Sequence, residues 1–288
     1  SHITSKQTLD KFCTTPLDDD ENRQLYELCT KASQLNAAPH ITTHHIKNRI
    51  HGLKAASAPG RTGTRPSHIS ASLRAPGGAR AWQQWVIHWS RGAVPPTIID
   101  MWTQPLFQPV PKPNSPGDTR PVALFDIPVK IATGTICDAQ QQEVFGVLGE
   151  YQYGTGMPSG AVRLLSEVKA CTTLFPNHTF TSLDATNAFG NMSKVHSLRA
   201  LINKTFSIAI IVASMWKIGP TTTWVESVPG VWAKHLIYDG AFQGGCLASV
   251  IYCIGAEAAI DTFWERAAAD PLIHEIIHPN IDTDTTPL

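Results

Sequence analysis

The spacing of hydrophobic and polar positions along this chain predicts more helix than strand. Residues 1–55 have helical spacing, and acidic side chains gather at 18–21, where the dipole of a helix start favours negative charge. Apolar residues recur with the helical period in five later segments, at about 78–92, 127–147, 161–174, 193–218 and 247–267. These segments predict a helix-rich molecule.

Three other segments are typical of β-strands. The proline-interrupted stretch after residue 92 predicts short strands on either side of a turn at Ser115-Pro116-Gly117. Residues 178–189 are rich in β-branched and aromatic side chains and predict a strand with Asp184 at its end. A hairpin is expected over about 221–245. The mixture predicts the α+β class, with a small antiparallel sheet among helices.

Trp82, Trp85 and Trp89 recur at spacings of three and four residues, so they share one face of the predicted helix at 78–92. Such a face is typical of a packed core. A platform on which nucleobases stack is the alternative.

Composition excludes several classes of protein. The chain has 288 residues, 42% of them hydrophobic, which is incompatible with a disordered or collagen-like chain and allows one large or two ordinary domains. The apolar run 206–218 is interrupted by polar residues and is shorter than the roughly 20 residues that a bilayer requires, so no membrane partner is expected. Six cysteines without a Cys-x-x-Cys pair predict free thiols, no disulfide partner and an intracellular location, in the nucleus or cytoplasm.

The formal net charge of zero conceals a strong segregation of charge. Residues 28–99 contain nine Lys and Arg and no carboxylate, so this segment carries +9 and the remainder of the chain −9. A surface that follows a phosphate backbone requires such clustered positive charge. The alternative is a solvated basic face without a partner. The nine residues are Lys31, Lys47, Arg49, Lys54, Arg61, Arg65, Arg74, Arg80 and Arg91.

Two features are candidates for chemistry. Asp184 is the only carboxylate between Glu167 and Glu226, and it follows an apolar strand pattern. A carboxylate in that setting is costly unless it is paired or binds a metal, although it would also suit the cap of the following helix. Gln243-Gly244-Gly245 precedes an apolar helix, an arrangement that lets backbone approach a ligand closely.

Lys112 and Arg120 flank the turn predicted at 115–117. Both side chains would therefore project from one hairpin towards an anion such as a triphosphate. Two exposed cations on a loop are the alternative.

The order of five segments adds a family resemblance. They are APGRTGTRPSHI, PKPNSPGDTRPVALFDIPVKI, QYGTGMPSGA, SLDATNAFGNMSKVHSLRAL and GAFQGGCLASVIYCIGAE. Together, over residues of about 50–265, the series resembles the reverse transcriptase domain of non-LTR retrotransposons. The resemblance implies a right-hand polymerase fold with fingers and a partial palm. It further implies a helical N-terminal extension at 1–55, a fingers-like region at 56–150 and the partial palm at 151–288.

The resemblance also implies roles for the candidate residues. Asp184, Ala188 and Phe189 match the family pattern Asp-x-x-x-Ala-Phe. Asp184 would be the catalytic residue that binds Mg²⁺. Phe189 would lie under the sugar of the incoming nucleotide and favour deoxynucleoside triphosphates.

Lys112 and Arg120 match the Lys-Pro and Arg-Pro pairs that hold the triphosphate in this family, and Gln243 and Gly244 match the Gln-Gly that lines the nucleotide pocket. The basic segment would hold the RNA template and DNA primer by their phosphates. The residues expected to do so are Lys47, Arg49, Lys54, Arg61 and Arg65.

One family block is missing. The chain contains no aromatic-x-Asp-Asp string, and Asp282 and Asp284 lack the apolar flanks of a buried strand that would make them substitutes. We therefore expect a fragment of a retrotransposon RNA-directed DNA polymerase, truncated before this block or decayed, and inactive as a nucleotidyltransferase. A non-catalytic nucleic-acid-binding remnant that uses residues 28–99 is one alternative. An unrelated α+β enzyme with Asp184 as acid or base is another.

Overall fold

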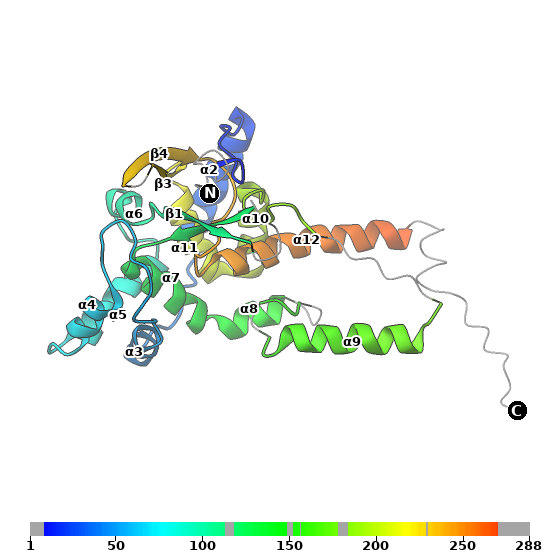
Figure 1. The fold of residues 1–288 in the computed structure, drawn as a ribbon, viewed down its shortest axis with the longest axis horizontal. Coiled ribbons are helices and arrows are strands. Elements are labelled where there is room, and N and C mark those ends of the chain that lie inside the picture. Colours follow the sequence, from blue (N-terminus) through cyan, green and yellow to red (C-terminus); the bar gives the residue numbers. More distant parts are fainter. Residues whose placement is uncertain are drawn as a thin grey trace, which may run out of the picture.

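Figure 1 shows the computed structural model of the chain, which describes residues 9–112, 118–148, 152–155, 157–177, 184–228 and 230–269. Helices predominate, as the sequence predicts, and a small sheet lies among them. The helices are α2 (Asp19–Ser33), α3 (Thr43–His51), α4 (Pro66–Leu73), α5 (Gly78–Ser90), α6 (Pro96–Trp102), α7 (Ile127–Ala139), α8 (Gln141–Val147), α9 (Gly160–Leu174), α10 (Lys194–Lys204), α11 (Phe206–Trp216) and α12 (Ala248–Ala269). The strands are β1 (Leu106–Pro111), β2 (Thr119–Leu124), β3 (Thr221–Val228) and β4 (Val231–Ile237).

The sheet has the strand order β2-β1-β3-β4. Both hairpins, β1–β2 and β3–β4, are antiparallel, whereas β1 and β3 pair in parallel through Leu106 with Trp224 and Phe107 with Val225. The expectation of a purely antiparallel sheet is therefore wrong for this central pair. The helices α7 to α11 lie between β1 and β3 in sequence and provide the long crossover that parallel strands require.

Two predicted helices are each divided in two. The segment predicted at 127–147 forms α7 and α8, and the segment at 193–218 forms α10 and α11, which are separated at Thr205. Thr205 is buried and leaves helical backbone angles, with φ −145° and ψ 80°. The apolar period continues through both breaks because the helices on either side contribute to the same core. Helix α6, which has Pro96 in its first turn, was not predicted.

The main core lies between helices. Trp89, Ile131, Leu198 and Ile211 are all fully buried in it. The ring of Trp85 lies 5.8 Å from that of Trp89, so the core-face interpretation of the tryptophan helix is confirmed. This core includes residues from Leu25 to Ile254. The boundaries expected at 55 and 150 stay predictions.

A second, smaller core lies under the sheet. Phe12 packs against Phe107 of β1 with their ring centroids 4.5 Å apart, and Phe242 packs against both. Tyr238 N donates to the backbone oxygen of Cys13 at 3.0 Å. The N-terminal segment 9–13 is thereby held beside the sheet.

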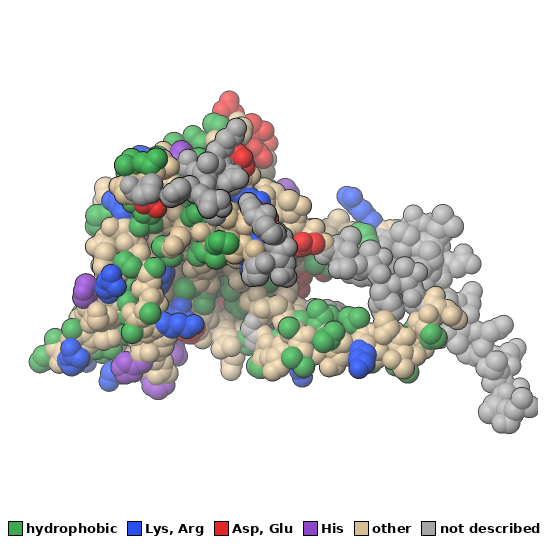
Figure 2. Space-filling model, viewed as in Figure 1, with side chains coloured by type: hydrophobic (Ala, Val, Ile, Leu, Met, Phe, Trp, Pro, Cys, Tyr) green, Lys and Arg blue, Asp and Glu red, His purple; other side chains and the backbone are tan. Residues whose placement is uncertain are grey.

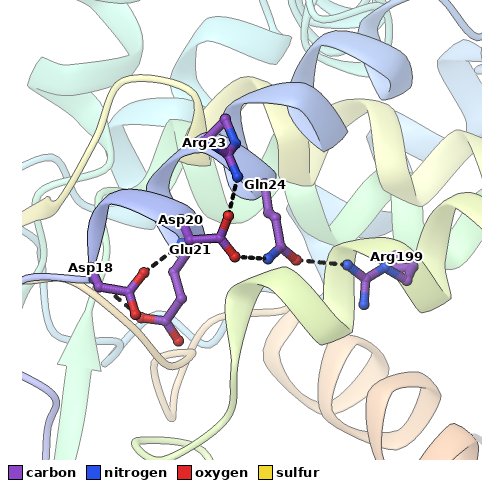
Figure 3. A network of polar contacts seen from close by, with 6 residues as sticks. All are labelled: Asp18, Asp20, Glu21, Arg23, Gln24 and Arg199. Atoms are coloured by element: carbon purple, nitrogen blue, oxygen red, sulfur yellow. Dashed lines mark hydrogen bonds and ion pairs between the residues drawn. The ribbon is translucent and has the colours of Figure 1, made fainter.

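The acidic cluster at 18–21 begins α2, as its charge predicts. Asp18 Oδ1 accepts from Glu21 N at 2.8 Å, and Asp18 N donates to Glu21 Oε2 at 3.3 Å, which together form a capping box. Figure 3 shows how this helix end connects to α10: Asp20 accepts from the Gln24 amide, whose oxygen accepts from Arg199 at 2.9 Å.

The strand predicted to end at Asp184 falls outside the described residues except at Asp184 itself, so it stays a prediction. Residues 178–183 are not described, and a turn follows Asp184 at residues 186–191. Asn187 has φ 51°, a left-handed backbone that a strand does not contain. Asn191 closes the turn, with Nδ2 donating to the oxygen of Thr186 at 2.9 Å.

All six cysteines are free thiols. Among the helices within the described ranges, none combines the length and hydrophobicity of a membrane span.

Candidate functional site

A cavity of about 210 Å³ lies where the β1–β2 hairpin meets the turn at 184–190. We call it the Asp184 cavity. The residues that line it come from four separate parts of the chain. They include all but one of the residues that the resemblance assigns to metal and nucleotide, namely Lys112, Arg120, Asp184, Phe189 and Gln243.

Asp184 is exposed, and it is the only carboxylate among the described residues that line the cavity. It does not cap the following helix, because the side chain of Ser193 accepts from His196 N at the start of α10. That alternative from the sequence is therefore wrong. Within the described ranges there is no group of three or more His, Cys, Asp or Glu placed to hold a metal ion.

Phe189 is fixed by contacts on two sides. Its ring lies 5.3 Å from that of Tyr252 on α12, and its backbone oxygen accepts from Ala241 N at 2.8 Å. Gly240 packs so closely that a Cβ there would lie 2.5 Å from the oxygen of Gly190. The turn that carries Asp184 is therefore held directly against the segment that leads to Gln243.

Gly244 lies behind the cavity wall. It has φ +106°, and a Cβ at this position would lie 2.6 Å from the oxygen of Ala123 in β2. The backbone oxygen of Gln243 accepts from Ala123 N at 2.7 Å. Only glycine permits this contact, which brings Gln243 alongside the strand that carries Arg120.

Three cations line the cavity. Lys112 Nζ lies 2.6 Å and Lys11 Nζ 3.1 Å from the carboxylate of Asp118. Hydrogen bonds from Lys112 and then Lys11 hold the pKa of Asp118 far below its ordinary value. Arg120 is exposed. Sequence reasoning missed Lys11, because only the packing of Phe12 beneath the sheet brings it to this place.

Of the nine basic residues in 28–99, all except Arg49 are exposed, including Lys47, Lys54 and Arg65. Figure 2 shows Lys, Arg and His side chains gathered over α3, α4 and α5. Arg61 is also exposed, and its guanidinium donates to Gln104.

Arg49 is directed into the protein instead. Its guanidinium donates to Cys246 Sγ at 2.9 Å and lies 3.6 Å from the carboxylate of Asp138. A Cβ on Gly134 would lie 2.0 Å from this guanidinium, so the two side-chain positions interlock. Arg49 therefore makes contacts within the protein, whereas the nearby Lys47 is exposed.

The buried carboxylate of Asp126 was not singled out from the sequence. Asp126 is fully buried at the start of α7, and its Oδ1 accepts from Thr62 N at 3.0 Å and from Thr62 Oγ1 at 2.6 Å. A Cβ on Gly60 would lie 2.5 Å from Asp126 N. Asp126 therefore orders the Gly-Arg-Thr-Gly loop. The available signal was an acid directly before a helix with proline in its first turn.

No protein-family model matches this chain, and no curated protein matches it. The grouping of side chains around the Asp184 cavity is therefore the observation from which a function can be argued.

Proposed function

We propose that the Asp184 cavity binds a deoxynucleoside triphosphate, in a reverse transcriptase fragment of retrotransposon type that does not polymerise DNA as this chain. The observation that carries the proposal is the grouping around one cavity of Lys112, Arg120, Asp184, Phe189 and Gln243. These residues match separate family patterns.

The charges and shapes around the cavity suit this ligand. Lys112, Lys11 and Arg120 line the cavity with three cations, which would offset the negative charge of a triphosphate, and the guanidinium of Arg120 can hold two phosphate oxygens at once. The Phe189 ring packs against the Tyr252 ring, with the two centroids 5.3 Å apart. A fixed ring beneath the sugar would exclude a 2′-hydroxyl.

The donor set fits one Mg²⁺ that arrives with the triphosphate, because Mg²⁺ is commonly held by one or two carboxylates together with phosphate oxygens. Asp184 would hold it, and the ion would neutralise phosphate charge. A pair of metal ions needs further carboxylates, and among the described lining residues Asp184 stands alone. We therefore expect nucleotide binding without nucleotidyl transfer.

Nucleotide binding is tested by calorimetric titration of the full chain with dATP and with ATP, each with and without Mg²⁺. We expect dATP to bind more tightly than ATP, and Asp184→Asn to remove the effect of Mg²⁺. Asp19→Asn, an exposed acid in the first turn of α2, is the matched control and should behave as wild type. If Asp184→Asn and wild type respond equally to Mg²⁺, the assigned role of Asp184 is wrong.

The absence of polymerisation is tested separately. Primer extension on an RNA template with Mg²⁺ should give no product. Product that Asp184→Ala abolishes would show that the chain is a complete polymerase and would refute this part of the proposal.

A second candidate function is nucleic-acid binding without catalysis, and the eight exposed cations of residues 28–99 favour it. Each phosphate contact contributes about 0.9 to the slope of log affinity against log salt. The triple variant Lys47→Gln, Lys54→Gln, Arg65→Gln should lower that slope by about 2–3 for duplex binding. A slope that is near zero in the wild type would exclude this function, whatever the result with nucleotides.

A further inference from the structure

The four-stranded sheet has one face packed on the small core and one open face. Phe107 and Val225 point into the core and are almost fully buried. Side chains alternate along a strand, so their neighbours Leu106 and Trp224 lie on the other face. A groove of about 480 Å³ runs over that face, and it is lined by Arg61, Leu106, Trp224 and Trp232. We call it the tryptophan groove.

Buried polar contacts hold two of its walls in place. The amide oxygen of Gln104, which is 8% exposed, accepts from Trp224 Nε1 at 3.0 Å and also from the Arg61 guanidinium. Arg61 Cζ consequently lies 5.5 Å from the centre of the Trp224 ring. A flat cation is thereby fixed over an indole at the edge of the groove.

The remaining wall is more open. Trp232 is 38% exposed and lies two residues from Lys234, which pairs with Trp224 across β3–β4. Both side chains therefore share the open face with Trp224. Glu226 lies opposite Trp232, but its Oε1 accepts from Gly230 N at 2.7 Å in the hairpin turn. Beside Trp224, the two cations Arg61 and Lys234 outnumber the one carboxylate, Glu226, and this balance favours an anionic ligand.

We propose that the tryptophan groove binds single-stranded nucleic acid, with bases stacking on Trp232 and Trp224 and phosphates meeting Arg61 and Lys234. Indole faces accept any base, and clustered cations follow the backbone between bases, which is the usual basis of single-strand binding. A duplex buries its base faces in its own stack and offers no free face to Trp232. This inference rests on the proposed nucleic-acid function and assigns the unpaired strand to a specific place.

The groove is separate from the Asp184 cavity. Leu106 begins β1, whereas Lys112 follows its last residue. At a rise of about 3.3 Å per residue, the two ends of this strand are on the order of 20 Å apart. A substitution in the groove therefore leaves the residues of the Asp184 cavity in place.

The test measures fluorescence anisotropy of a labelled single-stranded oligonucleotide, as DNA and as RNA, with the full chain. Because stacking contributes about 1–3 kcal/mol per base, Trp232→Ala should weaken binding about fivefold to 150-fold. Trp232→Phe should retain most of the affinity. Leu236→Ala is the matched control, since Leu236 is also 38% exposed on the same face of β4.

An oligonucleotide of abasic sites separates stacking from charge. It should bind wild type and Trp232→Ala equally, because it offers phosphates without bases. If Trp232→Ala binds the normal oligonucleotide as wild type does, the groove is not the site, although the proposed nucleotide function survives in the titrations with dATP. If dATP fails to bind while Trp232→Ala still weakens oligonucleotide binding, the groove stands and the nucleotide proposal falls.

Discussion

At the scale of single residues, the Asp184 cavity depends on positions that do not themselves carry the proposed chemistry. Gly244 packs against β2 behind the cavity wall. Asp118 pairs with Lys112 and Lys11, two of the three cations that line the cavity. Gly244 was expected from the sequence to line the nucleotide pocket, whereas Asp118 was assigned no role. Substituting each of them therefore tests the structure of the cavity as well as its charge.

Gly244→Ala should destabilise the protein and impair nucleotide binding. The new Cβ would meet the Ala123 oxygen at 2.6 Å in a left-handed backbone, where strain costs about 1–3 kcal/mol. Chemical denaturation measures the loss of stability. Gly63→Ala is the control, since it also has positive φ but has open space around its Cβ, so its loss should be smaller. Equal losses would show that the contact with Ala123 has no effect.

Asp118→Asn should raise the affinity for triphosphate a few-fold. The carboxylate now occupies Lys112 and Lys11, so a triphosphate must displace it before it can bind these cations. Titration of the variant with dATP measures the change, and Asp19→Asn controls for the loss of one negative charge elsewhere. Unchanged or weaker binding by Asp118→Asn would contradict the competition.

At the scale of elements, the start of α10 contains an unusual buried cation. Lys194 is 1% exposed, its Nζ has no hydrogen-bond partner among the described residues, and it lies 5.8 Å from the centre of the Trp216 ring. Burial lowers its pKa to about 8, although the nearby carboxylate of Asp239 opposes the shift. The Lys194 backbone N also donates to Asp239 Oδ1 at 2.6 Å. The first residue of α10 is thus a buried lysine, and burial favours its neutral form.

The contribution of Lys194 to the free energy of unfolding should therefore rise with pH between about 8 and 9. In this range the unfolded chain keeps the proton on Lys194, whereas the folded chain releases it, so the unfolded state binds more protons. The expected gain is about 1 kcal/mol, and Lys194→Met should remove it. Burial raises the pKa of Cys29 and Cys137 to about 12 and also raises that of Cys253, so these thiols act in the opposite direction from about pH 8 upwards.

Urea denaturation of both proteins at pH 8 and pH 9 provides the measurement. At each pH the free energy of unfolding of Lys194→Met is subtracted from that of the wild type. This difference cancels the contributions of the other titrating groups. An identical pH dependence in the two proteins would show that Lys194 ionises in the folded state as it does in the unfolded state.

At the scale of the whole molecule, α9 and the second half of α12 extend away from the main body on the same side (Figure 1). Apolar side chains of α9 are exposed, with Val162 65%, Leu165 69% and Leu174 71% accessible. On α12, Ile260 is 50% accessible and Phe263 is 58% accessible. Large exposed apolar areas are uncommon on isolated soluble proteins and favour association.

We expect the isolated chain to self-associate as its concentration rises. The double variant Leu165→Lys, Leu174→Lys should reduce association, because it places charge on the exposed apolar face of α9. Ser166→Lys with Thr172→Lys is the control, since it adds the same charge at exposed polar positions of the helix. Sedimentation velocity at several concentrations measures the effect. A monomer at every concentration would contradict the expectation.

Most of the helices and both hairpins could be predicted from sequence because their signals are local, whereas α4 and α6 were not predicted. The segment expected at 161–174 forms α9, Gly160–Leu174, and the acidic residues before α2 form its capping box. Periodicity could not show where α10 ends and α11 begins, since both keep the same face towards the core. The candidate residues around Asp184 were selected by pattern, but their roles stay predictions.

The sequence by itself determined the helix-rich α+β composition, the segregation of basic charge and the identity of the candidate side chains. The tertiary structure decided the parallel pairing of β1 with β3, the presence of Lys11 beside Lys112, and the inward direction of Arg49. It also placed Arg61 over Trp224. These features depend on contacts between residues far apart in the chain, which form only when burial of the two cores brings their elements together, and no local pattern records them.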